Sequence, residues 1–111
     1  MKNYSLSKRC ILILFLTFMG TTFLNAAESN DFDAAERYQG TCFACHGTGQ
    51  AHAPIVGDVI EWEIRLEKGL DTLVQSTING LNGMMPARGL CTDCSDEQLK
   101  AIIDYMLDQS K

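Results

Sequence analysis

The sequence lacks a hydrophobic run long enough to cross a membrane. A membrane-spanning helix needs about 20 apolar residues, whereas the apolar run here extends from Cys10 to Met19 and contains Thr17. The sequence also lacks internal repeats, linkers and low-complexity segments. Its 111 residues therefore predict one small domain and exclude a repeat architecture.

The beginning of the chain has the order of regions found in a secretory signal peptide. The basic residues that precede the apolar run are Lys2, Lys8 and Arg9. Ala26 then supplies a small residue at a cleavage point. We predict a signal peptide over residues 1–26 and a mature domain over residues 27–111. The alternative is an uncleaved segment that anchors the protein to the membrane.

Positive charge is scarce after the predicted cleavage point. The mature segment has six lysine and arginine residues against 14 aspartate and glutamate residues, a formal net charge of −8. This charge argues against nucleic acid and against an anionic membrane surface as partners, because both repel an acidic protein. A protein partner with a basic docking face would suit it better.

The cysteines are grouped in a way that indicates two different roles. Cys10 belongs to the predicted signal peptide, and the other four cysteines form two C-x-x-C pairs. These pairs are Cys42/Cys45 and Cys91/Cys94. In an exported protein, an unused pair is expected to form a disulfide. Only the first pair is followed directly by a histidine, His46.

Cys42-Phe43-Ala44-Cys45-His46 has the C-x-x-C-H pattern of covalent c-type haem attachment. Two thiols at this spacing can reach both vinyl groups on one porphyrin edge, and the following histidine can bind the iron. Structural zinc is an alternative, but the gap from Cys45 to Cys91 far exceeds the usual spacing of about 15–20 residues. A thioredoxin-like motif expects a βαβ pattern, which is missing around Cys42. We predict haem attachment at Cys42 and Cys45 with His46 as an axial ligand.

A second candidate ligand lies in the glycine-rich stretch of residues 79–90. This stretch carries Met84 and Met85 directly before Pro86. A thioether suits haem iron, and His/Met ligation raises the reduction potential. Neighbouring residues in a loop point to different sides, so only one of the two methionines should bind the iron. The residues alone leave both as candidates.

The segment that follows His46, residues 47–57, is predicted to be a loop by its glycine and proline content. A metal-bound histidine usually donates its other ring N–H to a carbonyl or carboxylate. A carbonyl of this loop could accept that hydrogen bond, and the spacing does not identify which. His52 lies on the same side of the haem as His46, so we expect it to face solvent.

Apolar residues recur at helical spacing in four segments, which predicts an all-α fold with helices packed around one covalently attached haem. The residues expected to cap these helices are Asp31, Asp58, Asp71 and Ser95. The glycines expected to end the first three are Gly40, Gly69 and Gly80.

The C-terminal helix has the clearest pattern. Ser95 and Gln98 predict a capping box at its start. The apolar residues on one face of this amphipathic helix are Leu99, Ile102, Ile103 and Met106. In the second predicted helix, Trp62 is expected in the core, with its indole N–H available to a haem propionate.

Together these motifs resemble class I c-type cytochromes. Met85-Pro86-Ala87-Arg88-Gly89, followed by Cys91-x-x-Cys94-Ser95-Asp96-Glu97, is similar to the cytochrome c5 group of bacterial periplasmic cytochromes. The similarity extends over nearly all of residues 31–108. It departs from the group at Met84, where a smaller residue is expected.

The resemblance implies specific roles. It implies the small cytochrome c fold, one haem c, and first and last helices that cross. The site residues it implies are His46 and Met85 as axial ligands, the Pro54 carbonyl as acceptor for His46, and a Cys91–Cys94 disulfide. It also implies a periplasmic location, with a membrane-anchored form facing the periplasm as the alternative.

Function is predicted from the sixth coordination position. If Met85 fills it, the iron has no open site for a substrate, so we expect respiratory one-electron transfer and no enzymatic activity. Expected partners are periplasmic or membrane-bound redox proteins, namely a cytochrome reductase and an oxidase, with the protein itself a monomer or a weak dimer. One alternative is a small peroxidase or gas sensor with a labile methionine. Another is a protein without haem that uses the C-x-x-C pairs for binding or for disulfide exchange.

Overall fold

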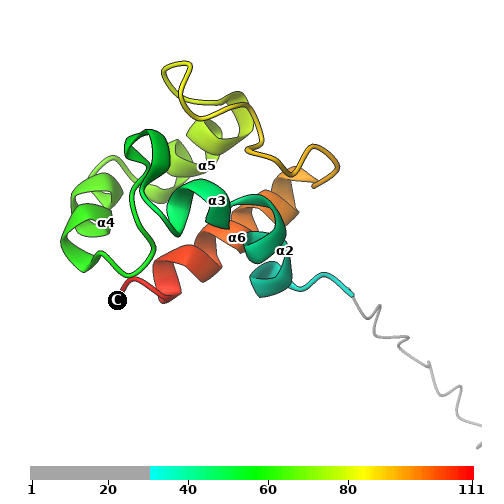
Figure 1. Cartoon of the computed structure of the whole chain (residues 1–111), viewed down its shortest axis with the longest axis horizontal. Helices are drawn as coiled ribbons and strands as arrows, with labels where there is room; N and C mark the ends of the chain where they lie inside the picture. The colour runs from blue at the N-terminus through cyan, green and yellow to red at the C-terminus, as the bar shows by residue number, and fades with distance from the viewer. Residues whose placement is uncertain (1–30) are drawn as a thin grey trace, which may run out of the picture. The chain divides into compact units, whose positions relative to one another are not determined.

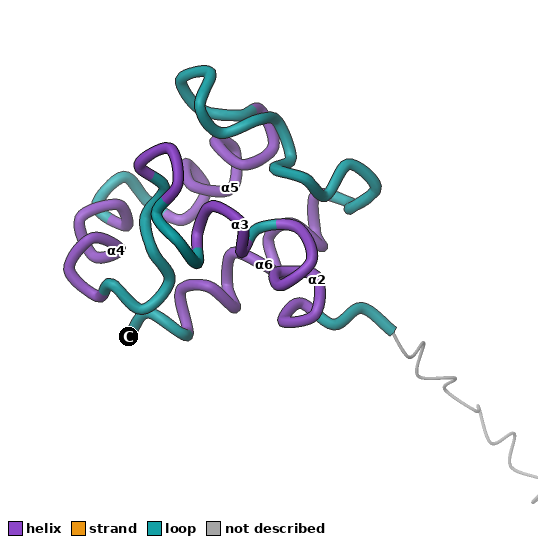
Figure 2. Tube along the Cα trace, viewed as in Figure 1, coloured by secondary structure: helices purple, strands orange, loops and turns teal. Residues whose placement is uncertain are grey.

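The structure is a computed structural model that describes residues 31–111. The predicted signal peptide lies outside the described residues. The helices are α2 (Ala34–Thr41), α3 (Phe43–His46), the short 3-10 helix η1 (Gln50–His52), α4 (Val59–Leu66), α5 (Leu70–Asn79) and α6 (Asp96–Asp108) (Figure 1). Figure 2 shows helices joined by loops and no strand within residues 31–111. The predicted all-α class is therefore confirmed.

The start of α2 differs from the prediction. Asp33, not Asp31, is the N-cap: its Oδ1 accepts hydrogen bonds from Ala35 N at 2.9 Å and Glu36 N at 3.1 Å. Gly40 does not end the helix, which continues to Thr41. A glycine inside a helix costs about 1 kcal/mol of stability. The chain nevertheless stays helical through Gly40 and enters α3.

The turn between α4 and α5 also differs from the prediction. Asp58 caps α4 as expected, accepting from Glu61 N at 3.1 Å. Asp71, however, lies in the first turn of α5, and Gly69 is the N-cap with φ of 87°. This conformation, which favours glycine, turns the chain directly from α4 into α5. Asp71 is left inside the helix, where its charge complements the helix dipole.

The core lies where α2 packs against α6 (Figure 1). Its buried residues include Tyr38 of α2, together with Leu99, Ile102 and Met106 of α6. Burial of each such large apolar side chain stabilises the fold by about 1.5–3 kcal/mol. The predicted capping box of Ser95 and Gln98 is present at the start of α6, so the predicted apolar face is the buried face.

None of the helices formed by residues 31–111 combines the length and hydrophobicity required to span a membrane.

Candidate haem-binding site

The junction of α2 and α3 positions the three residues of the C-x-x-C-H motif. Cys42 ends α2 and begins α3 in a helical conformation. Its carbonyl accepts hydrogen bonds from Cys45 N at 3.2 Å and His46 N at 2.9 Å. Residues three and four positions apart lie on one side of a helical turn. Both thiols are free and partly buried, so the turn presents two thiols and an imidazole together.

The ring of His46 is fixed by a backbone carbonyl. Its Nδ1 lies 2.9 Å from Pro54 O. A carbonyl can only accept, so Nδ1 carries the proton and the lone pair of the neutral imidazole is on Nε2. Burial lowers the pKa of His46 below its usual value, which keeps the imidazole neutral at pH 7. His46 therefore has the tautomer that a metal ligand needs.

Trp62 supports the segment that holds this carbonyl. Its indole N–H donates to Ile55 O at 2.9 Å, and its ring centroid lies 6.1 Å from that of His46. Trp62 is buried as predicted. The suggested hydrogen bond to a propionate is wrong, because the single indole N–H is already used by the Ile55 carbonyl.

The loop that carries the two methionines is held at its base. Leu81 and Met85 form an antiparallel bridge, with Leu81 N donating to Met85 O at 2.9 Å and Met85 N donating to Leu81 O at 3.1 Å. The Met84 side chain is 53 % exposed, whereas Met85 is half-buried. Of the two methionine side chains, only that of Met85 is thus partly covered by the protein.

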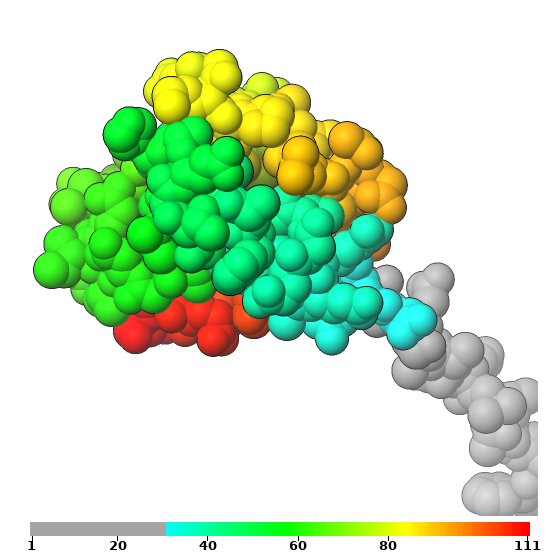
Figure 3. Space-filling model, in the orientation of Figure 1, coloured from blue at the N-terminus to red at the C-terminus, as the bar shows by residue number. Residues whose placement is uncertain are grey.

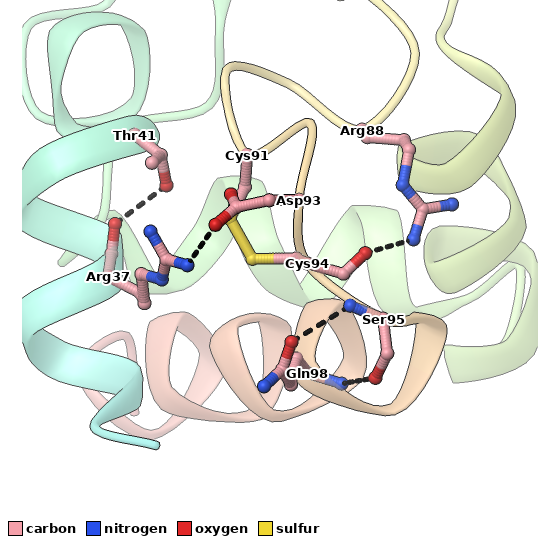
Figure 4. Close-up of polar contacts among 8 residues, drawn as sticks. All are labelled: Arg37, Thr41, Arg88, Cys91, Asp93, Cys94, Ser95 and Gln98. Carbon is pink, nitrogen blue, oxygen red and sulfur yellow. Dashed lines mark hydrogen bonds and ion pairs between the residues drawn. A yellow bond between two sulfur atoms is a disulfide. The ribbon is translucent and has the colours of Figure 1, made fainter. Parts of the chain in front are cut away.

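The Cys91–Cys94 pair is a buried disulfide next to this loop (Figure 4). Asp93 lies close to both sulfurs, but the sulfurs are bonded to each other and cannot serve as zinc thiolates. Their burial also keeps them from attack by an external thiol. Neither the zinc alternative nor disulfide exchange is supported here.

Apolar side chains are exposed on the segments that carry these groups. The exposed fractions are 42 % for Phe43, 43 % for Ile55 and 41 % for Leu81. Parts of the α3–η1 segment (green) and the methionine loop (yellow) appear on the face turned to the viewer in Figure 3. A large apolar ring system packs favourably on such side chains. Two thiols, a fixed imidazole, a thioether and apolar surface together fit a covalently bound haem.

Comparisons with known proteins match this geometry. A family model described as "Cytochrome C oxidase, cbb3-type, subunit III" matches residues 31–106. Cytochrome c5 of Azotobacter vinelandii is 48 % identical over 82 residues, covering 72 % of this chain and 93 % of the relative. Cytochrome c-555 of Chlorobaculum tepidum is 37 % identical over 99 residues, covering 84 % and 92 %. This chain belongs to the monohaem class I c-type cytochromes.

Solved structures place the cytochrome in the same fold. A mono-haem ferrocytochrome c from Shewanella putrefaciens aligns with a TM-score of 0.61 and 47 % identity, covering 71 % of this chain and 95 % of that one. A cytochrome c in an electron transfer complex with nitrite reductase aligns with a TM-score of 0.65 and 33 % identity, covering 70 % and 94 %. The predicted cytochrome c fold and covalent haem c are confirmed. The protein is a small electron-transfer haem protein.

The environment of Cys42 in this cytochrome does not favour thiol chemistry of the thioredoxin kind. Burial raises the pKa of the Cys42 thiol, and the Thr41 hydroxyl, 3.4 Å from its sulfur, partly opposes that effect. The thiolate is the nucleophile in disulfide exchange. A thiol that stays protonated at neutral pH is therefore poorly suited to that reaction.

Arg88 holds the methionine loop to α6 and was missed by the sequence analysis. Its guanidinium pairs with Asp96 at 2.8 Å and donates to Cys94 O, the second contact being visible in Figure 4. Its backbone N–H donates to Thr77 O of α5 at 2.7 Å. The sequence showed Arg88 only as a member of the Met85–Gly89 motif and gave no partner for it, because its contacts depend on how α5 and α6 pack.

Proposed function

We propose that this cytochrome carries one electron between respiratory redox partners in the periplasm, on a haem bound by Cys42, Cys45, His46 and Met85. In this proposal Cys42 and Cys45 would hold the haem through thioethers, and His46 Nε2 and Met85 Sδ would bind its iron. A haem bound in this way would supply one-electron redox chemistry. The observation that carries the proposal is the His46 Nδ1–Pro54 O hydrogen bond, because it frees Nε2 for the iron.

Met85 is proposed as the axial ligand in place of Met84. Its backbone is hydrogen-bonded on both sides by Leu81, so its position is fixed before any metal contact. The Met84 side chain, in contrast, is 53 % exposed. A weak thioether ligand benefits from such a fixed backbone, because less conformational entropy is lost when it binds.

The same fixed loop disfavours the peroxidase and gas-sensor alternatives. Those functions need a methionine that leaves the iron so that a peroxide or gas can bind. Here the loop is held by the Leu81–Met85 bridge and by Arg88. We therefore propose that the chain has no enzymatic activity of its own.

The proposed partners are redox proteins with a basic docking face. Five ion pairs engage basic residues of the described chain: Arg37–Asp93, Arg65–Glu61, Arg88–Asp96, Lys100–Asp104 and Lys111–Asp108. Because acidic residues outnumber basic ones, the electrostatic potential around the molecule is negative. A cytochrome reductase and an oxidase or reductase with lysine-rich surfaces would be attracted to it. The solved complex of a related cytochrome c with nitrite reductase supports a protein partner of this class.

Optical spectra of the exported protein test the proposal directly. We expect haem that stays with the chain after denaturing extraction, and a thioether-to-iron band in the oxidised protein. Met85→Ala should abolish that band, lower the reduction potential and allow carbon monoxide to bind the ferrous iron, because it removes the sixth ligand. Met84→Ala is the matched control and should leave all three properties unchanged. A band lost in Met84→Ala and kept in Met85→Ala would reverse the assignment.

A further inference from the structure

A buried serine at the end of the chain's C-terminal helix contacts the segment that fixes His46. Ser110 is 5 % exposed. Its Oγ accepts a hydrogen bond from Gly57 N at 2.9 Å and donates one to Met106 O at 2.8 Å. Gly57 and Ser110 are 53 positions apart in the sequence. The hydroxyl thus joins α6 to the loop that precedes α4.

The loop of residues 54–57 is short, and one backbone group of each of its four residues forms a hydrogen bond with a defined partner. Pro54 O faces His46 Nδ1, Ile55 O accepts from Trp62, and Val56 N donates to His46 O at 2.8 Å. Gly57 N, the fourth backbone group, donates to Ser110. Among these partners, His46 belongs to α3 and Trp62 to α4. Ser110 is the partner that belongs to neither helix. It therefore ties the loop to the core helix of the molecule.

We propose that Ser110 is a positioning residue that keeps the Pro54 carbonyl in hydrogen-bond contact with the proximal histidine and thereby sets the reduction potential. The inference rests on the proposed role of His46 as the axial ligand. Its physical basis is that a hydrogen bond from Nδ1–H makes the imidazole a stronger electron donor. A stronger donor stabilises ferric iron and lowers the potential.

Ser110→Ala removes both the acceptor for Gly57 N and the donor to Met106 O. The segment of residues 54–57 then loses this hydrogen bond to the end of α6 and keeps only the apolar packing of Val56, so the His46–Pro54 hydrogen bond should weaken. The reduction potential should rise. We expect the equilibrium constant for reduction to increase about threefold, which is about 28 mV for one electron at 59 mV per tenfold change.

Ser95→Ala is the matched control. Ser95 caps the other end of the same helix and forms its side-chain hydrogen bond with Gln98, not with residues 54–57. It should lower the stability of α6 without moving the potential. Ser110→Thr keeps the hydroxyl and should restore the wild-type potential. The measurements are spectroelectrochemical titration of the haem-loaded protein and urea unfolding of the same samples.

Two NMR measurements on the haem-loaded protein separate the possible outcomes. In the wild type, Gly57 N–H should exchange slowly, and His46 Nδ1–H should exchange faster in Ser110→Ala. A fast-exchanging Gly57 amide in the wild type overturns the inference without any variant. A loss of stability in Ser110→Ala that equals that of Ser95→Ala, with no change in potential or Nδ1–H exchange, overturns it too. Imidazole signals of His46 without the shift caused by haem would contradict the proposed ligand itself, which is a different result.

Discussion

At the residue scale, Gly80 determines how closely the methionine loop can return to the end of α5. Its φ is 81°, and a Cβ at this position would lie 2.8 Å from Met85 O and 2.9 Å from Ala87 N. These neighbours are backbone atoms, which cannot move aside as a flexible side chain can. Glycine is therefore required for both conformation and space.

Gly80→Ala should displace Met85 from the iron. The backbone conformation, with φ of 81° and ψ of 167°, is nearly restricted to glycine and alone costs about 1–3 kcal/mol for a residue with a Cβ. The contact with Met85 O pushes the loop outward as well. We expect the thioether-to-iron band to weaken or disappear and carbon monoxide to bind the ferrous protein. Absorption spectra with and without carbon monoxide provide the measurement.

Gly83→Ala is the control within the same loop. Gly83 has φ of 70°, but a Cβ there would meet nothing within 4 Å. It should lose some stability, because its positive φ favours glycine, and it should keep the band. If both variants keep the band, then close approach at Gly80 does not position the methionine.

Residues whose roles depend on near neighbours in the sequence were predictable, and those with distant partners were not. Cys42, Cys45 and His46 lie within one helical turn, so their spacing alone indicates that they act together. The Pro54 carbonyl was implied by resemblance, because spacing could not select one carbonyl of the loop. Ser110 was missed because its contact with Gly57 exists only after α6 packs.

At the scale of elements, an ion pair joins α2 to the disulfide loop. Arg37 Nη2 lies 2.6 Å from Asp93 Oδ2 (Figure 4). The hydrogen bond from Arg37 lowers the pKa of the Asp93 carboxyl below its ordinary value of 3.8. The folded-state pKa is therefore lower than the unfolded one. The resulting stabilisation is present above the unfolded pKa and is lost as the pH falls through the folded pKa.

Asp93→Asn should make the stability of the protein less sensitive to acid. The variant has no carboxylate to protonate at this position, so unfolding free energies measured in urea should fall less between neutral pH and pH below 3.8. The effect is small because the pair is exposed to solvent. Glu63→Gln is a suitable control, since Glu63 is exposed on α4 and has no ion pair within the described part of the chain. An equal change in both variants would mean that net charge, not the pair, is responsible.

The four longer helices were predictable at this scale, but both ends of α2 and the start of α5 were not. The Ser95–Gln98 capping box was found because both partners lie within four residues of the sequence. Asp31 and Asp33 are chemically equivalent as caps, and only the path of the chain decides that Asp33 reaches the free N–H groups. Asp71 lost its predicted role because Gly69 could begin the helix two residues earlier.

At the scale of the whole molecule, the helices contribute unequally to the buried core. The buried apolar residues gather where α2 meets α6, together with the disulfide. In contrast, α4 buries only Trp62 completely, and α5 buries none of its residues completely. These two helices therefore have little protein core to hold them. In the proposed function, α4 and α5 pack on the haem instead. The sequence of neither helix reveals this packing by itself.

A variant without covalent haem should lose much of this structure. Cys42→Ala combined with Cys45→Ala removes both thioethers, and we expect lower helical content and a broad, weakly cooperative thermal transition, because α4 and α5 lose the group on which they pack. Far-UV circular dichroism during heating measures both properties. Cys91→Ala combined with Cys94→Ala is the matched control, since it removes two buried sulfurs and a disulfide. That crosslink closes a small ring and restricts the unfolded chain little, so the control should keep its haem and helical content and melt cooperatively at a lower temperature. Native helical content and a sharp transition in the haem-free variant would show that protein contacts alone sustain the fold.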